Sequence, residues 1–315
     1  MTPLIPTTVV TGFLGSGKTT LMNRILNGDH GLKIAVMVND FGAINIDSQL
    51  IVSAEQNMVN LANGCICCTV ESDLIEQLHK LLSLRERPEH ILIETSGVSA
   101  PSKVVNTLRY PQFRDRLRVD AVVAMVDSEQ FCELEGEMAQ LAMDQLSVAD
   151  IVVLNKTDVA SPEQLQQLRE KWLYPQARTF ETHFADIPIE LLLGVKAADR
   201  SQSTSHHHKD NCCVGHPEFT TFNWDHELPL DLKKLRQAFK ALPSNIYRAK
   251  GFVQLSEAPQ ERCLLQMVGT RVEMEKNGPW PKTPRSQIVF IGWGELEVDQ
   301  IQTQLELCLA EDLKE

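Results

Sequence analysis

Short apolar runs recur along the first two thirds of the chain and alternate with longer amphipathic stretches. The runs are rich in β-branched residues and cover residues 8–10, 34–38, 91–93, 121–126 and 151–154. Because these runs are apolar throughout rather than at alternate positions, they are typical of strands buried on both faces. A mainly parallel sheet with helices on either side meets that requirement, since each crossover helix shields one face. Residues 1–195 are therefore predicted to form an α/β domain.

The pattern changes after this domain. Residues 196–217 have no apolar periodicity and are rich in Ser, His, Asp, Asn and Cys, which indicates a mobile loop between domains. Strand-like segments then follow at residues 219–222, 251–255, 264–268, 271–274 and 288–291. Helix-like segments cover residues 230–242 and a closing stretch through residue 309. Residues 218–315 are predicted to form a smaller α+β domain.

Composition and charge narrow the possible partners. The 315 residues are 43% hydrophobic and 23% charged, enough to bury a sizeable core in two domains. The net charge of -12 argues against a nucleic acid or an anionic membrane, because either partner requires a concentrated basic face. No apolar run reaches the roughly 20 residues of a transmembrane helix, and the N-terminus lacks a signal-peptide pattern. We therefore expect a cytoplasmic protein.

A glycine-rich segment follows the first apolar run and precedes a helical pattern. It reads Gly12-Phe-Leu-Gly-Ser-Gly-Lys-Thr19, which matches the P-loop spacing. Its backbone N–H groups and the helix N-terminus suit phosphate binding. Lys18 is predicted to reach the β- and γ-phosphates, and the Thr19 hydroxyl to coordinate Mg²⁺. The predicted phosphate-binding residues are Gly12, Gly15, Ser16, Gly17, Lys18, Thr19 and Thr20. A strand-to-helix turn without a ligand is the disfavoured alternative.

A second segment ends the run at 91–93. Glu94 follows that run, and Gly97 comes three positions later. Strand ends of open parallel sheets face the ligand crevice, so Glu94 is predicted to contact Mg²⁺ through water and Gly97 to offer its amide to the γ-phosphate. Lys18, Thr19 and Glu94 are the predicted catalytic residues for hydrolysis of the nucleotide. The alternative for Glu94 is an ordinary surface carboxylate.

A third segment, Asn155-Lys156-Thr-Asp158, predicts which base is bound. A carboxylate accepts hydrogen bonds from guanine N1–H and the 2-amino group, whereas adenine lacks that pair of donors. Since charge-assisted hydrogen bonds contribute about 1.5–3 kcal/mol, discrimination is expected to exceed ~100-fold. Asn155, Lys156 and Asp158 are therefore predicted to bind GTP. An ATP-dependent small-molecule kinase is the alternative that this motif disfavours.

Three cysteines fall within four positions between the second and third predicted strands. Cys65, Cys67 and Cys68 are soft ligands suited to Zn²⁺ or Cu(I). Adjacent Cys67 and Cys68 point to different sides of any regular element, so an incomplete, open coordination shell is expected. Such a shell suits metal transfer better than scaffolding. Buried apolar cysteines and a redox role are the alternatives.

A second group of metal-binding side chains lies in the loop at 196–217. It contains four imidazoles and two thiols: His206, His207, His208, Cys212, Cys213 and His216. This composition is consistent with capture of a transition metal, and a solvated polar linker is the alternative. Zn²⁺ is the predicted metal, with Co²⁺ as the alternative, because thiolates favour zinc whereas imidazoles also accept cobalt. The remaining cysteines (Cys132, Cys263 and Cys308) stand alone among apolar residues and receive no role.

Together these segments resemble the CobW-type GTPases, a family associated with metal insertion and zinc allocation. The resemblance is carried by residues 11–20, 39–42 with 46–47, 64–68, 94–97 and 155–158, and by 248–251 and 288–292 for the family's C-terminal domain. It implies GTP hydrolysis coupled to metal delivery, with Cys65, Cys67 and Cys68 as ligands. Many members read Asn-Glu-Phe-Gly-Glu in the second segment, where this chain has Asp40 and Ala43. Asp40 or Asp47 is the candidate replacement as metal ligand or Mg²⁺ neighbour.

The function that these observations favour is a GTP-hydrolysing metallochaperone that passes zinc to an acceptor protein. GTP and Mg²⁺ are expected to order residues 39–47 and thereby change the geometry of the cysteines. Slow intrinsic hydrolysis is expected, since the sequence identifies no arginine finger or catalytic glutamine. A nucleotide- or metal-dependent homo-oligomer is a further expectation. The alternatives are a regulatory GTP-binding module with a structural metal site and a cobalt insertion factor.

Overall fold

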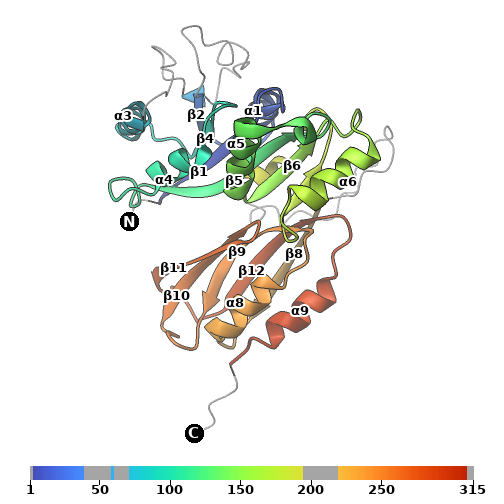
Figure 1. The fold of residues 1–315 in the computed structure, drawn as a ribbon. Coiled ribbons are helices and arrows are strands. Elements are labelled where there is room, and N and C mark those ends of the chain that lie inside the picture. The colour runs from blue at the N-terminus through green and yellow to red at the C-terminus, as the bar shows by residue number, and fades with distance from the viewer. Residues whose placement is uncertain (1–2, 39–57, 60–70, 194–218, 311–315) are drawn as a thin grey trace. The chain divides into compact units, whose positions relative to one another are not determined.

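The computed structural model describes residues 3–38, 58–59, 71–193 and 219–310, and it divides into two units, Met1–Leu193 and Gly194–Glu315. The first unit contains a parallel sheet with the strand order β3-β2-β4-β1-β5-β6-β7 (Figure 1). Its strands are β1 (Ile5–Gly12), β2 (Ile34–Val38), β3 (Met58–Val59), β4 (His90–Glu94), β5 (Leu117–Asp127), β6 (Ile151–Asn155) and β7 (Thr179–Glu181). The five predicted apolar runs lie within β1, β2, β4, β5 and β6, which confirms the α/β prediction.

Helices cover both faces of this sheet, as the uniformly apolar strands require. Their bounds are α1 (Lys18–Asn27), α3 (Glu71–Leu82), α4 (Pro101–Leu108), α5 (Gly136–Ser147), α6 (Pro162–Lys171), α7 (Ile189–Leu193) and the 3₁₀ helix η1 (Phe131–Glu133). Helices α3 and α4 share a core with Val9 and Val122, and α5 and α6 share one with Ala124, on the same face of β5 as Val122. Thr8 points to the other face and donates a hydrogen bond to the Leu192 carbonyl of α7.

In its described residues, 219–310, the second unit is an antiparallel sheet with two helices. Its strand order is β11-β10-β9-β12-β8, and α8 and α9 contribute Leu235, Phe239, Ile301 and Leu305 to its core. Strand β12 pairs antiparallel with both β8 and β9, so β8, α8 and β9 form a crossover around it. The bounds are β8 (Phe219–His226), α8 (Leu232–Lys240), β9 (Ile246–Gln254), β10 (Glu261–Val268), β11 (Arg271–Pro279), β12 (Ser286–Trp293) and α9 (Val298–Glu306). The predicted smaller α+β domain is confirmed.

Several predicted boundaries in this unit were wrong; β8 and β11, for example, extend to His226 and Pro279, beyond the predicted 222 and 274. Strand β9 begins at Ile246, five residues before the predicted start, because the strand includes a buried arginine, Arg248, which interrupts the apolar pattern. Helix α9 ends at Glu306 rather than at residue 309. The chain turns there to pair with residues 229–231: the Asp231 amide donates to the Cys308 carbonyl at 2.8 Å, and the Ala310 amide to the Pro229 carbonyl at 2.9 Å. The loop predicted at 196–217 lies outside the described residues.

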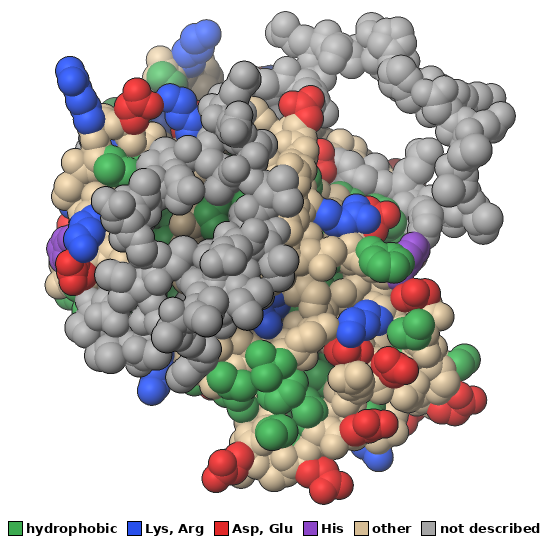
Figure 2. All heavy atoms as spheres, turned by 90° about the horizontal axis from the view of Figure 1, so that it is seen from above, with side chains coloured by type: hydrophobic (Ala, Val, Ile, Leu, Met, Phe, Trp, Pro, Cys, Tyr) green, Lys and Arg blue, Asp and Glu red, His purple; other side chains and the backbone are tan. Residues whose placement is uncertain are grey.

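The surface carries charged side chains of both signs (Figure 2), and the described helices lack the features of membrane spans. Figure 2 shows acidic and basic side chains interspersed on the face in view. Among the described helices, none has both the length and the apolar character needed to cross a membrane.

Candidate functional site

The loop between β1 and α1 depends on glycine at both of its ends. Gly12 has a φ of 138°, and a Cβ atom there would lie 2.1 Å from the Met125 carbonyl oxygen of β5. Gly17 has a φ of 100°, and its Cβ would lie 2.4 Å from the Asn155 side chain. Helix α1 begins at the next residue, so the free N–H groups of its first turn lie at the end of the loop. The geometry is that of a phosphate-binding loop.

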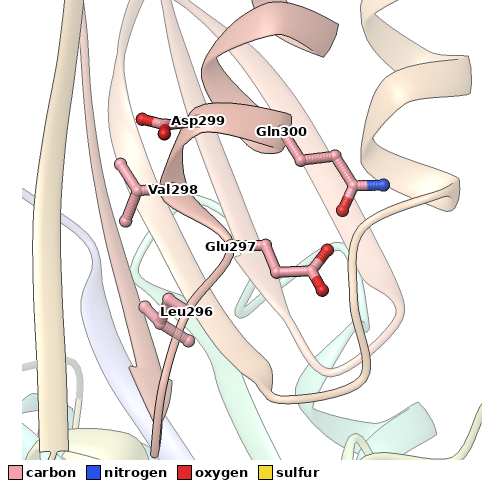
Figure 3. A pocket seen from close by; sticks show the side chains of 5 residues that line it. All are labelled: Leu296, Glu297, Val298, Asp299 and Gln300. Atoms are coloured by element: carbon pink, nitrogen blue, oxygen red, sulfur yellow. The ribbon is translucent and has the colours of Figure 1, made fainter.

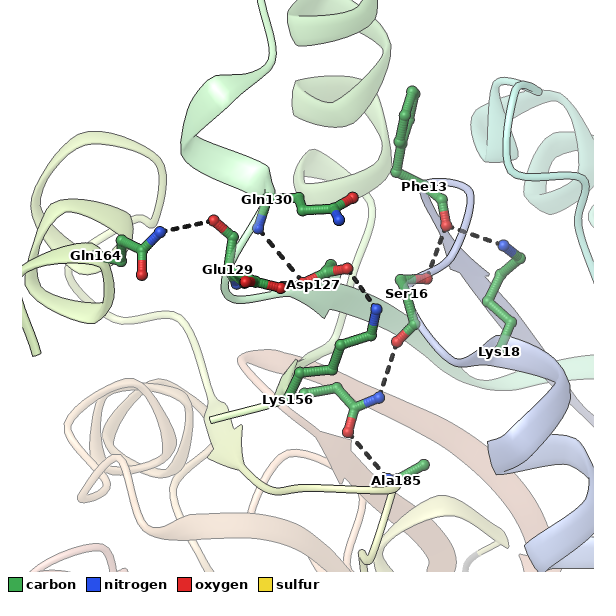
Figure 4. A network of polar contacts seen from close by, with 10 residues as sticks. Phe13, Ser16, Lys18, Asp127, Glu129, Gln130, Lys156, Gln164 and Ala185 are labelled. Carbon is green, nitrogen blue, oxygen red and sulfur yellow. Dashed lines mark hydrogen bonds and ion pairs between the residues drawn. The ribbon is translucent and has the colours of Figure 1, made fainter. Parts of the chain in front are cut away.

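Lys18 lies over this loop with its side chain buried (Figure 4). Its ammonium group donates to the Phe13 carbonyl at 3.1 Å, and the Ser16 hydroxyl donates to the same oxygen at 2.8 Å. Both contacts hold the loop closed on itself. The Lys18 ammonium group, the predicted phosphate-binding cation, therefore lies at the predicted phosphate-binding loop.

Thr19 and Glu94, the two predicted Mg²⁺ residues, lie next to each other. The Thr19 hydroxyl donates to a Glu94 carboxylate oxygen at 3.3 Å, although 75 positions separate them in the chain. Strand pairing explains this contact: Glu94 ends β4 opposite Val10 of β1, and its side chain is only 2% exposed. A hydroxyl and a carboxylate oxygen are the hard donors that Mg²⁺ prefers, so this pair fits the ion.

Gly97 lies against the phosphate-binding loop. A Cβ atom at this position would come within 2.7 Å of the Leu14 side chain and 2.8 Å of its amide nitrogen. The Gln145 side chain of α5 is buried and donates to the Gly97 carbonyl at 3.1 Å, which fixes the segment after Glu94. Gln145 was missed by sequence reasoning, because a single glutamine within a helix carries no motif.

Asn155 connects two segments through both atoms of its amide. Its nitrogen donates to the Ser16 carbonyl at 2.9 Å, and its oxygen accepts from the Ala185 amide at 2.9 Å. The side chain is 2% exposed. Asn155 therefore acts by holding the phosphate-binding loop against the segment around Ala185.

Lys156 is held by an acidic residue that sequence reasoning missed. Its ammonium group lies 2.6 Å from an Asp127 carboxylate oxygen, and the other oxygen of Asp127 accepts from the amides of Glu129 and Gln130 (Figure 4). The Lys156 backbone has a φ of 61°, in the left-handed region. Asp127 ends an apolar run as Glu94 does, and that position was the available signal.

Asp158, the predicted base-reading carboxylate, is exposed. Within the described residues no hydrogen bond or ion pair engages its side chain. Two positions earlier, Lys156 is tied to Asp127, and Thr157 donates both its amide and its hydroxyl to the Thr182 carbonyl. The carboxylate is thus carried on a fixed segment while its oxygens stay accessible. Gly15 and Thr20 are also exposed.

The predicted metal ligands lie outside the described residues: Asp40, Asp47, Cys65, Cys67, Cys68, His206, His207, His208, Cys212, Cys213 and His216. Within the described ranges, no three His, Cys, Asp or Glu side chains gather in a way that suits a metal ion. Cys263 and Cys308 are buried, and that burial raises the pKa of both thiols. They are neutral core residues at pH 7.

A pocket of about 560 Å³ lies in the second unit, at the start of α9 (Figure 3). It is lined by Leu296, Glu297, Val298, Asp299 and Gln300. Two carboxylates among five lining residues disfavour a phosphate ligand, because like charges repel. None of the predicted site residues contributes to it.

Comparison with known proteins gives the same two-part division. Residues 6–180 match the family described as CobW/HypB/UreG, nucleotide-binding domain, and residues 219–309 match the cobalamin synthesis protein cobW C-terminal domain. A zinc chaperone CobW from Pseudomonas aeruginosa is 32% identical, covering 97% of this chain and 92% of the relative. The zinc chaperone YjiA from Escherichia coli is 30% identical, covering 91% and 94%. The crystal structure of the Zn(II)-bound YjiA GTPase from E. coli aligns with a TM-score of 0.44 at 24% identity, covering 98% of this chain and 100% of that chain.

Proposed function

The chain belongs to the CobW/HypB/UreG family, and from this premise we propose that it is a metallochaperone that binds zinc and delivers it to an acceptor protein under the control of GTP. It is a P-loop GTPase. The observation that carries the proposal is the convergence of Lys18, Thr19 and Glu94 at one end of the sheet, with the Asn155–Asp158 motif fixed beside them. Relatives that match over nine tenths of the chain are named zinc chaperones.

The hydrolytic site is assigned to the ends of β1 and β4. The loop amides and Lys18 would bind the phosphates. Thr19, and Glu94 through water, would hold Mg²⁺, whose positive charge would offset that of the β- and γ-phosphates. Gly97 approaches the loop closely and orients its segment toward the γ-phosphate. Hydrolysis is proposed to be slow in the isolated protein, because the sequence identifies no arginine finger or catalytic glutamine.

The base site is assigned to the segment that follows β6. Asp158 accepts hydrogen bonds from guanine N1–H and the 2-amino group, Lys156 presents its aliphatic stem, and Asn155 fixes the spacing between base and phosphates. Support for this assignment comes from the open Asp158 carboxylate beside two side chains that are already bonded.

The zinc cargo is assigned to Cys65, Cys67 and Cys68, with Asp40 and the side chains of the loop at 196–217 as further ligands. Three thiols in four positions suit zinc, and an incomplete shell suits its release. The nucleotide state is proposed to change the geometry of this group through residues 39–47. The acceptor, a protein with its own zinc site, completes the transfer.

Replacing Asp158 by Asn tests the nucleotide part of the proposal. The amide introduced by this substitution donates where the carboxylate accepts, and xanthine carries an oxygen where guanine carries its 2-amino group. We therefore expect Asp158→Asn to weaken GTP binding more than ~100-fold and to improve binding of xanthosine triphosphate. Equilibrium binding of both nucleotides and of ATP measures this. An unchanged preference for GTP in the variant would overturn the base assignment.

A cobalt insertion factor is the second candidate. The observation that favours it is the match of residues 219–309 to a domain described as belonging to a cobalamin synthesis protein. Metal analysis of the protein captured with its acceptor in the GTP-bound state separates the two, since the bound metal is zinc in one case and cobalt in the other.

A further inference from the structure

The loop between β7 and α7 contains two consecutive residues in an unusual backbone conformation. Phe184 and Ala185 have φ values of 51° and 54°, in the left-handed region that residues with a side chain rarely adopt. Such conformations persist only where surrounding contacts impose them, and they are concentrated at functional sites. The loop is therefore held in a shape that its sequence does not favour.

Four contacts impose this shape. From α1, the Arg24 guanidinium donates to the Phe184 carbonyl at 2.8 Å and pairs with the Asp186 carboxylate at 2.6 Å. The Ala185 amide donates to the Asn155 side chain, and the Thr182 hydroxyl donates to the Asp186 carbonyl at 2.8 Å. The loop is thus bonded both to α1, the helix that follows the phosphate-binding loop, and to Asn155 of the predicted base-binding motif.

The result of this arrangement is an exposed aromatic ring. Phe184 is 68% exposed, whereas the other phenylalanines whose exposure the structure describes are buried or half-buried. The His183 ring contacts it at a centroid distance of 6.1 Å with the planes at 77°, an edge-on contact that limits rotation. An aromatic ring that is open to solvent provides a flat apolar surface for a planar ligand.

We propose that Phe184 is a base-stacking residue of the nucleotide site. This inference rests on the proposed binding of GTP. The ring is carried one residue before Ala185, whose amide is bonded to Asn155, and Thr157 is bonded to Thr182 at the start of the same loop. The loop that carries the ring therefore lies beside the segment that carries Asp158.

Phe184 and Asp158 have different roles in base recognition: the ring adds affinity, and the carboxylate selects the base. Every purine has an apolar face, so stacking adds affinity without choosing between bases. Asp158 reads the donor edge and supplies the choice. The proposal therefore predicts that loss of the ring weakens binding of guanosine and inosine nucleotides alike, whereas loss of the carboxylate affects the preference among bases.

The test compares Phe184→Ala and Phe184→Tyr with a matched control, Tyr174→Ala. Tyr174 is an aromatic residue of the same unit, 61% exposed and outside the predicted site. Affinities are measured for GTP, for inosine triphosphate and for inorganic tripolyphosphate, which has no base. Stacking predicts a loss of about 5- to 150-fold for both nucleotides in Phe184→Ala. Phe184→Tyr, Tyr174→Ala and all tripolyphosphate affinities should stay at the wild-type value.

Two outcomes would overturn the assignment of Phe184. One is an equal loss for tripolyphosphate and GTP in Phe184→Ala, which means that the variant disturbs the loop rather than the base contact. The other is an unchanged GTP affinity in Phe184→Ala while Asp158→Asn loses its preference for guanine. Failure of the proposed function is a different result: wild-type protein that does not bind GTP in preference to ATP.

Discussion

Replacing Asn155 by Ala should separate the phosphate-binding loop from the segment around Ala185. Both hydrogen bonds of its amide are buried and 2.9 Å long. Each contributes about 1 kcal/mol net, and the Ala185 amide left without an acceptor adds to the cost, so the free energy of unfolding should fall by about 2–4 kcal/mol. Since GTP binding depends on the spacing of the two segments, its affinity should fall about tenfold or more, equivalent to about 1.4 kcal/mol.

Thermal unfolding and equilibrium GTP binding measure the two effects. In a unit of this size the melting temperature should drop by about 2–4 °C per kcal/mol. Asn155→Asp is the informative comparison, because it keeps an acceptor for Ala185 but places an oxygen against the Ser16 carbonyl; it should be at least as harmful. Asn27→Ala is the control, since the Asn27 amide bonds to the Asn23 carbonyl at the surface. Wild-type stability and affinity in both Asn155 variants would refute the reasoning.

Three further predictions rest on contacts at the same site and on buried thiols. Asp127→Asn removes the negative charge that pairs with the Lys156 ammonium and should weaken GTP binding about tenfold at unchanged kcat, a split visible in steady-state kinetics; a fall in kcat alone would contradict it. Glu94→Gln removes the buried charge beside Thr19 and should slow hydrolysis about 100-fold and raise the Mg²⁺ concentration required; an unchanged Mg²⁺ requirement would exclude Glu94 from the ion site. Burial raises the pKa of the Cys263 and Cys308 thiols, so iodoacetamide at pH 7 should modify them only after unfolding, as peptide mass spectrometry would show; rapid alkylation of the native protein would contradict this.

The parallel sheet was predictable because its buried strands are uninterrupted apolar runs in the sequence. Strand β7 (Thr179–Glu181) was not, since only its central residue is buried and the flanking residues are polar. It forms because it pairs in parallel with β6, and the local sequence pattern does not reveal this tertiary interaction. The prediction for β9 began too late for a related reason: the buried Arg248 interrupts the apolar pattern in the sequence.

The nucleotide site was predictable in its motifs but not in its supports. Recognisable motifs contain Lys18, Thr19, Glu94 and Asn155. Their partners lie outside such motifs: Asp127 and Gln145 act through folded contacts with Lys156 and with the Gly97 carbonyl. The loop at Phe184 has no glycine to mark its left-handed backbone, so the sequence there suggests nothing unusual.

Nucleotide-controlled zinc binding is the central claim, and the affinity of the full chain for Zn²⁺ in different nucleotide states tests it most directly. The measurement is made with GDP and with a non-hydrolysable GTP analogue, each with Mg²⁺, in competition with a zinc chelator. We predict that the two affinities differ by a factor of about 5–150, and that zinc changes the affinity for the GTP analogue relative to GDP by the same factor. Equal zinc affinities in both states, or a metal that resists chelation until the protein unfolds, would contradict it.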